Sequence, residues 1–373
     1  MAHAYTPGLK VTPRARIRKE RILPLKGQVV AWTAGKVLAD TVVARTQLPG
    51  DVKTLNIAGL LGVPPEDVEA YLIKHPGDSL KKEEIIAQTK GIFGFMKSTI
   101  KSPVDGTFES FSKITGQAIL RQAPIQVEIN AYIDGIVTEV FPEKGVAVET
   151  VGAFIQGIFG IGGEANGIIA KVSSSPSDVL TPDEITKELE GKILIGGSLV
   201  TCETLKKAAE CGCKGIVVGG IADKELIDFL GHDIGVAITG SEQKGITLVV
   251  TEGFGQMNMA ERTFELLCSQ EGKKASINGA TQIRAGVLRP EVIVPCDEGL
   301  TEIKEEIRIK GVEVGSKVRI IREPHFGEIG KVVALPSELQ FVETGAKVRI
   351  FEVELAGGTH ITLPRANVEI IEE

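Results

Sequence analysis

The sequence predicts a multidomain, mainly β protein with a central α/β domain. With 373 residues the chain is longer than one ordinary domain, and its 43 glycines place turns at short intervals. Residues 27–172 repeat a pattern of a glycine, a few alternating β-forming residues and a second glycine, whereas residues 181–297 alternate between strand and helix patterns. Residues 311–373 return to short alternating strands.

The composition is typical of a globular chain in a reducing compartment. Hydrophobic residues make up 43% of the chain and charged residues 24%. The net charge of −7 argues against a protein that coats nucleic acid along its whole surface, because phosphate binding needs clustered Lys and Arg. The 5 cysteines lack paired spacing and indicate free thiols, so we expect a cytoplasmic location. No apolar run reaches the roughly 18 residues of a membrane span, and we expect no membrane insertion.

Basic residues dominate the N-terminal segment, residues 1–26. Arg14, Arg16 and Arg18 occupy alternate positions with apolar residues between them, as on a strand with one basic face. Such a face fits a contact with RNA or another anion. It equally fits a solvated edge strand whose charges prevent aggregation.

Residues 27–172 are expected to form β modules with internal repeats. Asp-Gly pairs before alternating residues are a strong hairpin signal. The most informative motifs are Gly-Asp-Ser-Leu at 77–80, Ile-Ile-Ala at 85–87 and Ser-Pro-Val-Asp-Gly-Thr at 102–107. This series resembles the biotinyl/lipoyl family and its barrel-sandwich-hybrid relatives. The resemblance extends over residues 22–172 and implies flattened, mostly β modules.

The same resemblance draws attention to Lys97, because biotinyl domains carry a Met-Lys pair whose lysine is modified at a hairpin tip. Here the spacing differs from that family. Lys97 stands close to Ile100, and the expected turn falls at residues 91–94, so Lys97 lies along one arm of the hairpin. We therefore expect no biotin or lipoyl attachment and no other cofactor.

The tetrapeptide Gly-Ile-Phe-Gly occurs twice, at residues 91–94 and 157–160. Glycines on both sides of Ile-Phe allow a tight turn that presents two apolar side chains. The turns are either exposed docking tips for a partner or caps that fold inward onto the core. The candidate partner-binding residues are Ile92, Phe93, Ile158 and Phe159.

A breaker cluster at residues 173–178 predicts a domain boundary, and an α/β domain is expected over residues 181–297. Its expected strands lie at 192–195, 215–218, 235–238 and 246–251, and its expected helices at 202–211, 222–230 and 258–270. A charged, helix-prone connector follows at 298–310.

Ligands of α/β sheets collect where strands end and helices begin. The candidate ligand-binding residues at such turns are Gly196, Gly197, Ser198, Gly219, Gly220, Thr239, Ser241 and Glu252, with Arg284 and Arg289 as an anion clamp. Cys202, Cys211 and Cys213 lack the paired spacing of a zinc site, and we expect no metal. No nucleophile motif or full dinucleotide fingerprint occurs, so no catalytic residue is assigned.

Residues 311–373 begin with an alternating strand pattern. Pro324, Gly327 and Gly330 come next, and Lys-Val-Val follows Gly330 directly. This segment resembles the KOW motif of NusG-type transcription factors and several ribosomal proteins. The resemblance implies an SH3-like barrel of five short strands that binds RNA or protein. The implied contact residues are Lys317, Arg319, Arg322, His325, Phe326 and Lys331. Seven Lys and Arg against ten Glu give this segment a net charge of −3, which favours a protein partner.

The leading hypothesis is a non-enzymatic adaptor or scaffold that binds a protein or ribonucleoprotein partner in transcription or translation. The KOW-like barrel and the β modules would make the contacts, and RNA could be touched by the barrel or the basic N-terminal segment. The alternative is a small-molecule-binding or enzymatic α/β domain that acts as a subunit of a larger complex. The first predicts exposed apolar tips, whereas the second predicts a polar pocket lined by Ser198, Thr239, Ser241 and Glu252.

Overall fold

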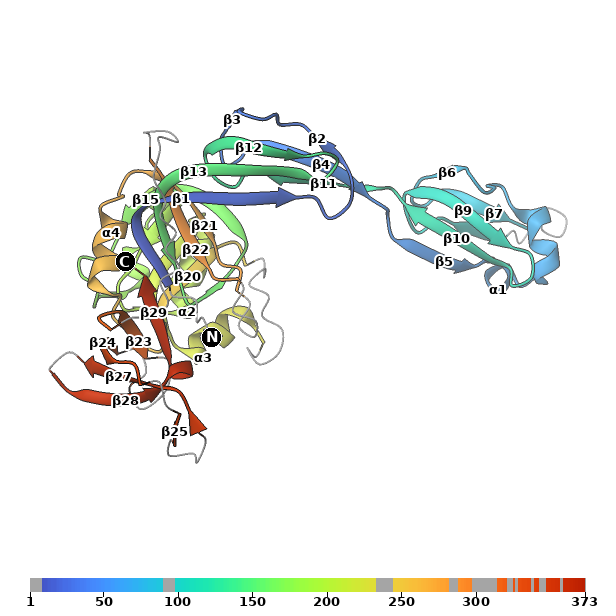
Figure 1. The fold of residues 1–373 in the computed structure, drawn as a ribbon. Coiled ribbons are helices and arrows are strands. Elements are labelled where there is room, and N and C mark those ends of the chain that lie inside the picture. The colour runs from blue at the N-terminus through green and yellow to red at the C-terminus, as the bar shows by residue number, and fades with distance from the viewer. Residues whose placement is uncertain are drawn as a thin grey trace.

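The computed structural model describes residues 9–89, 98–232, 244–281, 288–296, 314–320, 325, 328–336, 339–341, 347–355 and 358–372. Within these ranges the chain is mainly β with few helices, as the sequence predicts. Figure 1 shows a body that carries an arm of two β lobes on one side and a C-terminal sheet on another. None of the described helices is long and apolar enough to cross a membrane.

The body is built on a sheet with parallel strands at its centre. The parallel strands are β15 (Glu164–Lys171), β17 (Lys192–Ile195), β19 (Gly215–Ile221) and β20 (Thr247–Phe254). The antiparallel strands that extend it are β14 (Phe159–Ile161), β21 (Lys274–Asn278) and β22 (Glu291–Pro295). Helices α2 (Cys202–Glu210) and α3 (Asp223–Leu230) pack on one face, and α4 (Glu261–Cys268) packs on the other. The strands and helices expected at 192–230 and 246–270 are therefore present.

The body sheet continues across the boundary that the sequence predicts at residues 173–178. Strand β15 precedes this breaker cluster and β17 follows it, yet the two strands are parallel neighbours. The Asp178 carboxylate accepts hydrogen bonds from the N–H groups of Ser174 and Ser175 at 2.9 and 2.8 Å. These bonds shape a loop within the sheet, because Asp and Ser side chains can satisfy the backbone of a turn wherever it occurs. Short strands β16 (Val179–Leu180) and β18 (Leu199–Val200) pair beside it.

Two long strands join the body to the arm. Strand β1 (Leu9–Ile22) pairs antiparallel with β13 (Gly145–Gln156) along nearly its whole length. The first half of β13 also pairs with β12 (Gly135–Phe141) in the arm, and its second half pairs with β22 in the body. The arm therefore leaves the body as continuous sheet, and the strand expected in the basic N-terminal segment is confirmed.

The inner part of the arm is the proximal lobe, in which two sheets face each other. One contains β1, β13, β12 and β3 (Lys36–Val37), and the other contains β2 (Gln28–Val29), β4 (Val42–Leu48) and β11 (Ile125–Asn130). Alternate residues of these strands point inward. With Ile133 from the connection between β11 and β12, they form a core that includes Ile17, Val43, Val137 and Val148.

The outer part is the distal lobe, which is inserted between β4 and β11. Its four-stranded sheet contains β5 (Val52–Asn56), β10 (Gln117–Gln122), β9 (Gly106–Ser112) and β6 (Ser79–Leu80). The remaining elements are the hairpin β7 (Ile85–Gln88) with β8 (Thr99–Lys101), helix α1 (Ile57–Leu61) and the 3-10 helix η1 (Pro65–Tyr71). Phe108, Ile86 and Leu120 lie at the centre of its core, which shares no residue with the other cores. The repeat region expected at 27–172 thus divides between two lobes and the body.

The C-terminal sheet has its strands where the sequence predicts them. Its five strands are β23 (Lys317–Ile320), β24 (Ile329–Ala334), β27 (Ile350–Leu355), β28 (His360–Pro364) and β29 (Val368–Glu372), in the order β29-β23-β24-β27-β28. A small hairpin joins β25 (Gln340–Phe341) and β26 (Lys347–Val348). The sheet meets the body where Leu9 and Lys10 of β1 pair with β29.

Candidate functional site

Charged side chains of β1 cross the joint between arm and body. Arg21 grips both carboxylate oxygens of Glu164 at 2.6 Å, and its Nε donates to the carbonyl oxygen of Asn130 at 2.7 Å. The Nζ of Lys19 lies 2.6 Å from Glu291. Because Glu164 and Glu291 belong to the body strands β15 and β22, these pairs fix the direction in which the arm leaves. Two-pronged Arg–carboxylate pairs are geometrically the most specific of ion pairs.

Tyr132, in the arm, also forms hydrogen bonds to the body at this joint. Its hydroxyl lies 3.1 Å from Glu291, and its carbonyl oxygen accepts a hydrogen bond from the Ser276 hydroxyl of the body. Its backbone φ of 71° is unfavourable for a residue with a Cβ. Burial, and next the Glu291 carboxylate, raise the pKa of the Tyr132 phenol well above its ordinary value. The phenol therefore stays protonated and donates to Glu291.

The basic face of β1 is largely matched by acids. Arg16 lies 2.6 Å from Glu149, and Arg18 lies 2.6 Å from Glu139 and 3.3 Å from Glu149. Burial raises the pKa of the Glu149 carboxyl, but hydrogen bonds from Arg16, Thr138 and Arg18 outweigh burial and leave this pKa below its ordinary value. The two arginines are thus tied to neighbouring strands, a state that fits a charged edge strand better than an open contact for nucleic acid.

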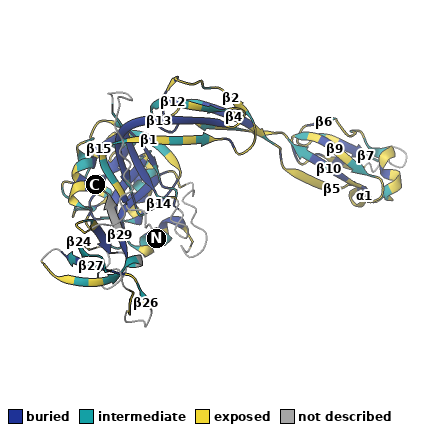
Figure 2. Ribbon diagram, in the orientation of Figure 1, coloured by how far each residue is buried: buried dark blue, intermediate teal, exposed yellow. Residues whose placement is uncertain are grey.

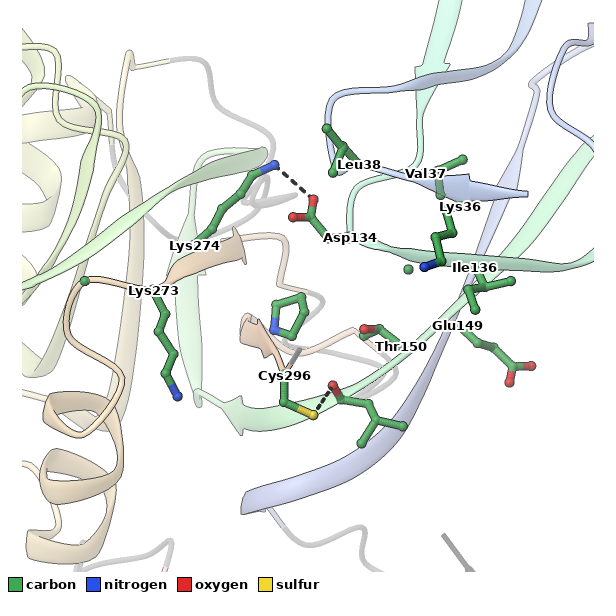
Figure 3. A pocket seen from close by; sticks show the side chains of 14 residues that line it. Lys36, Val37, Leu38, Asp134, Ile136, Glu149, Thr150, Lys273, Lys274 and Cys296 are labelled. Carbon is green, nitrogen blue, oxygen red and sulfur yellow. Dashed lines mark hydrogen bonds and ion pairs between the residues drawn. The ribbon is translucent and has the colours of Figure 1, made fainter. Parts of the chain in front are cut away.

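A cavity of about 480 Å³ opens where the base of the arm meets the body (Figure 3). We call it the joint cavity. Its lining residues include Lys36, Leu38, Asp134, Thr150, Lys273, Lys274 and Cys296. Asp134 connects its walls, since Oδ1 accepts hydrogen bonds from the N–H of Ala39 at 2.6 Å and from Lys274 Nζ at 2.9 Å. The Cys296 thiol donates to the carbonyl oxygen of Val151 at 3.0 Å.

The predicted ligand turns at the ends of β17 and β19 come together, but the chain itself fills the space between them. Ser198 is fully buried, and its hydroxyl donates to the carbonyl oxygen of Ser177 at 2.8 Å. An added Cβ would lie 2.3 Å from Asp178 O at Gly197, 2.1 Å from Met257 O at Gly219 and 2.1 Å from Gly255 O at Gly220, while at Gly196 it would make an ordinary contact with Leu180. Glycine is therefore required at positions 197, 219 and 220, because the loops at Asp178 and at 255–257 pack directly against the backbone.

Glu252 and Arg319, which the sequence assigns to two different sites, bind each other. Arg319 is 3% exposed, and its Nη1 lies 3.0 Å from Glu252 Oε2 and 3.0 Å from the carbonyl oxygen of Thr251. The other oxygen of Glu252 accepts the N–H of Ala260, just before α4, at 3.1 Å. Arg319 is thus an internal contact between the C-terminal sheet and the body.

The second Gly-Ile-Phe-Gly turn folds inward, so the docking-tip interpretation of residues 157–160 is wrong. Phe159 is 2% exposed, lies on β14 opposite Val250, and has its ring 5.1 Å from that of Phe254. Ile158 packs against the same core. Residues flanked by two glycines can enter an antiparallel strand as readily as a turn, and burial of the ring decides between the two.

The remaining predicted residues are scattered. Lys317 and Lys331 are exposed and stand opposite each other on β23 and β24, and His325 Nδ1 lies 3.0 Å from Glu328. Arg289 is half-buried just before β22. The predictions at Ile92, Phe93, Lys97, Thr239, Ser241, Arg284, Arg322, Phe326, the strand at 235–238 and the connector at 298–310 lie outside the described residues.

The thiols are all free, and within the described part of the chain no group of three or more His, Cys, Asp or Glu could hold a metal ion. Cys213 is the most buried of them, at 1% exposed. Burial, and next the neighbouring Cys211, raise the pKa of the Cys213 thiol to about 11.

Cys213 should therefore resist alkylation in the folded protein. At about pH 8 only about 0.1% of a thiol with this pKa is thiolate, the reactive form. We expect iodoacetamide to leave Cys213 unmodified under native conditions while the half-buried Cys211 reacts, as peptide mass spectrometry would show. The unfolded chain is the control and should react at all five cysteines. Equal native rates at Cys211 and Cys213 would contradict the burial described here.

Sequence reasoning missed the joint residues, because their partners are remote along the chain. Arg21 and Glu164 are 143 positions apart, and Lys19 and Glu291 are 272 apart. The charged residues along 16–21 are the sequence feature that points to these positions, but they do not identify the partners. A scan against protein-family models and a search of curated proteins both found no match.

Proposed function

We propose that this chain is a non-enzymatic adaptor that presents its distal lobe to a protein or ribonucleoprotein partner. One observation carries the proposal. The distal lobe has a core of its own and stands at the far end of the arm, away from the body (Figure 1). The chain enters it between β4 and β5 and leaves it between β10 and β11, and these two connections link the lobe to the rest of the arm.

The outer end of the distal lobe supports this proposal. Ile114, in the β9–β10 turn, is 90% exposed, and Leu60 on α1 is 58% exposed. The turn and the helix are adjacent, because the N–H groups of Ile57 and Ala58 donate to the carbonyl oxygen of Gly116 at 3.0 and 3.2 Å. Figure 2 shows the exposed residues around α1. Exposed apolar side chains on two adjacent segments offer contact points for a partner.

We further propose that the two lobes are barrel-sandwich-hybrid-like modules and that the C-terminal sheet is a KOW-type, SH3-like barrel. The facing sheets of the proximal lobe and the five-strand order of the C-terminal sheet support this assignment. Lys331 on β24 is exposed and offers a second contact. The free thiols favour a cytoplasmic setting.

The test deletes the distal lobe and keeps the pairing of β4 with β11 in the proximal lobe. Leu48 and Ile125 are paired neighbours on β4 and β11, so replacing residues 49–124 with Asn-Gly leaves a two-residue hairpin. We expect tagged full-length protein to capture a partner from native lysate and the shortened chain to lose it, while the thermal transition of the body stays unchanged. Parallel samples treated with nuclease separate protein from ribonucleoprotein partners.

The double variant Leu60→Glu/Ile114→Glu is the matched comparison, because both positions are exposed and the changes affect only the outer end of a lobe that stays folded. Loss of the partner in both variants places the contact at that end. Capture of the same partner by the full and the shortened chain would overturn the proposal.

A further inference from the structure

The joint cavity has the size and construction of a small-molecule site. Its volume of about 480 Å³ lies within the range of about 300–1,000 Å³ typical of ligand pockets. The arm contributes the segments at 36–38 and 134–136, the long strand β13 contributes 149–151, and the body contributes 272–274 and 295–296. Figure 3 shows these segments around the cavity, so a site here would require arm and body to be in place together.

The charges around the joint cavity leave a positive excess. The Asp134 carboxylate is held by Lys274 at 2.9 Å, and the Glu149 carboxylate is held by Arg16 and Arg18 at 2.6 and 3.3 Å. Lys36 has no ion-pair or hydrogen-bond partner among the described residues. Both acids of the lining are thus neutralised, and the ammonium of Lys36 is left to attract an anion.

Thr150 places a hydrogen-bond donor on the wall of the joint cavity. Its side chain is 6% exposed and lines the joint cavity, and within the described ranges its hydroxyl makes no hydrogen bond. The hydroxyl is therefore open to the cavity, where it can donate a hydrogen bond to a bound molecule. Figure 3 shows Thr150 on the strand that passes beneath Lys36.

We propose that the joint cavity binds a small oxyanion, a carboxylate or phosphate, between the Lys36 ammonium and the Thr150 hydroxyl. An ammonium and a hydroxyl both donate hydrogen bonds, and charge-assisted bonds to an oxyanion are the strongest of this kind. Lys273 adds positive charge on the body side. A ligand held there touches both arm and body. This site is separate from the proposed adaptor contact at the distal lobe.

Isothermal titration of the full chain with citrate and, separately, with inorganic phosphate tests the proposal. We expect at least one of the two probes to bind, and expect Lys36→Gln to weaken its binding at least about tenfold through loss of a charge-assisted bond. Thr150→Val keeps the shape of the side chain and should weaken binding by about threefold to tenfold. Fluorescence gives a second readout, because the chain has 1 tryptophan, Trp32, on the turn before β3.

The matched control is Lys53→Gln, which removes the same charge from β5 of the distal lobe. It should bind the probe as the unmodified chain does, and melting curves should show all variants folded. Binding of citrate alone or phosphate alone identifies the anion class. Failure of both probes to bind the unmodified chain, or equal weakening by Lys36→Gln and Lys53→Gln, would overturn the proposal and leave the adaptor proposal untouched.

Discussion

Replacing Glu252 with glutamine should lower the free energy of unfolding by about 3 kcal/mol and loosen the C-terminal sheet from the body. The change leaves the buried Arg319 guanidinium without its counter-charge, 3.0 Å from a neutral amide. Loss of one member of a buried ion pair is costly because the remaining charge is still desolvated. Chemical denaturation gives the change in free energy, and hydrogen exchange should show faster exchange in β23 and at the end of β20.

Two further variants make this result specific. Arg319→Met combined with Glu252→Gln removes the stranded charge and should recover part of the loss, which a double-mutant cycle measures. Lys331→Met removes an exposed charge from the adjacent strand β24 and should change stability by less than about 0.5 kcal/mol. A Glu252→Gln variant as stable as the Lys331→Met variant would show that the pair does not hold the sheet to the body.

Phe108→Ala should unfold the distal lobe while the body stays folded. Phe108 is fully buried at the centre of the distal core, and truncating a buried Phe costs about 3–5 kcal/mol. That loss is a large part of the stability expected for so small a unit. Because the distal core shares no residue with the others, calorimetry should show one early transition and one unchanged transition.

Hydrogen exchange locates the early transition. Peptides from β9 and β10 should lose protection in the Phe108→Ala variant, whereas peptides from β17 and β19 should keep it. Ile114→Ala, at an exposed position of the same lobe, is the control and should leave both transitions in place. A single transition shifted as a whole would mean that the lobe and the body unfold together.

Local periodicity was enough to find most elements of the body and the C-terminal sheet. Strands β17, β19 and β20 are short apolar runs between glycines, and helices α2 to α4 carry apolar residues at helical spacing, so each is decided by nearby residues. The same holds for β1, whose alternating arginines show a strand. Its partner β13 begins more than a hundred residues later, and no local pattern specifies that pairing.

Burial explains where the site predictions and the structure differ. The sequence marks Arg319 and Glu252 as candidate contact residues, because charged side chains are expected at the surface. Only the tertiary contact at 3.0 Å makes them a buried ion pair. The glycines after β17 and at the end of β19 are the residues that a ligand-binding turn would need. A turn packed against a neighbouring loop needs the same small residue, so the sequence does not distinguish the two. The joint cavity lies between segments that no motif connects.

The continuity of β1 and β13 across the joint also has a mechanical consequence. A pull on the proximal lobe reaches the body along the covalent backbones of two strands that lie side by side, so it does not peel their hydrogen bonds apart one after another. The ion pairs of Arg21 and Lys19 brace these strands against sideways bending. The inner part of the arm is therefore built to hold the proximal lobe at a fixed distance from the body under load.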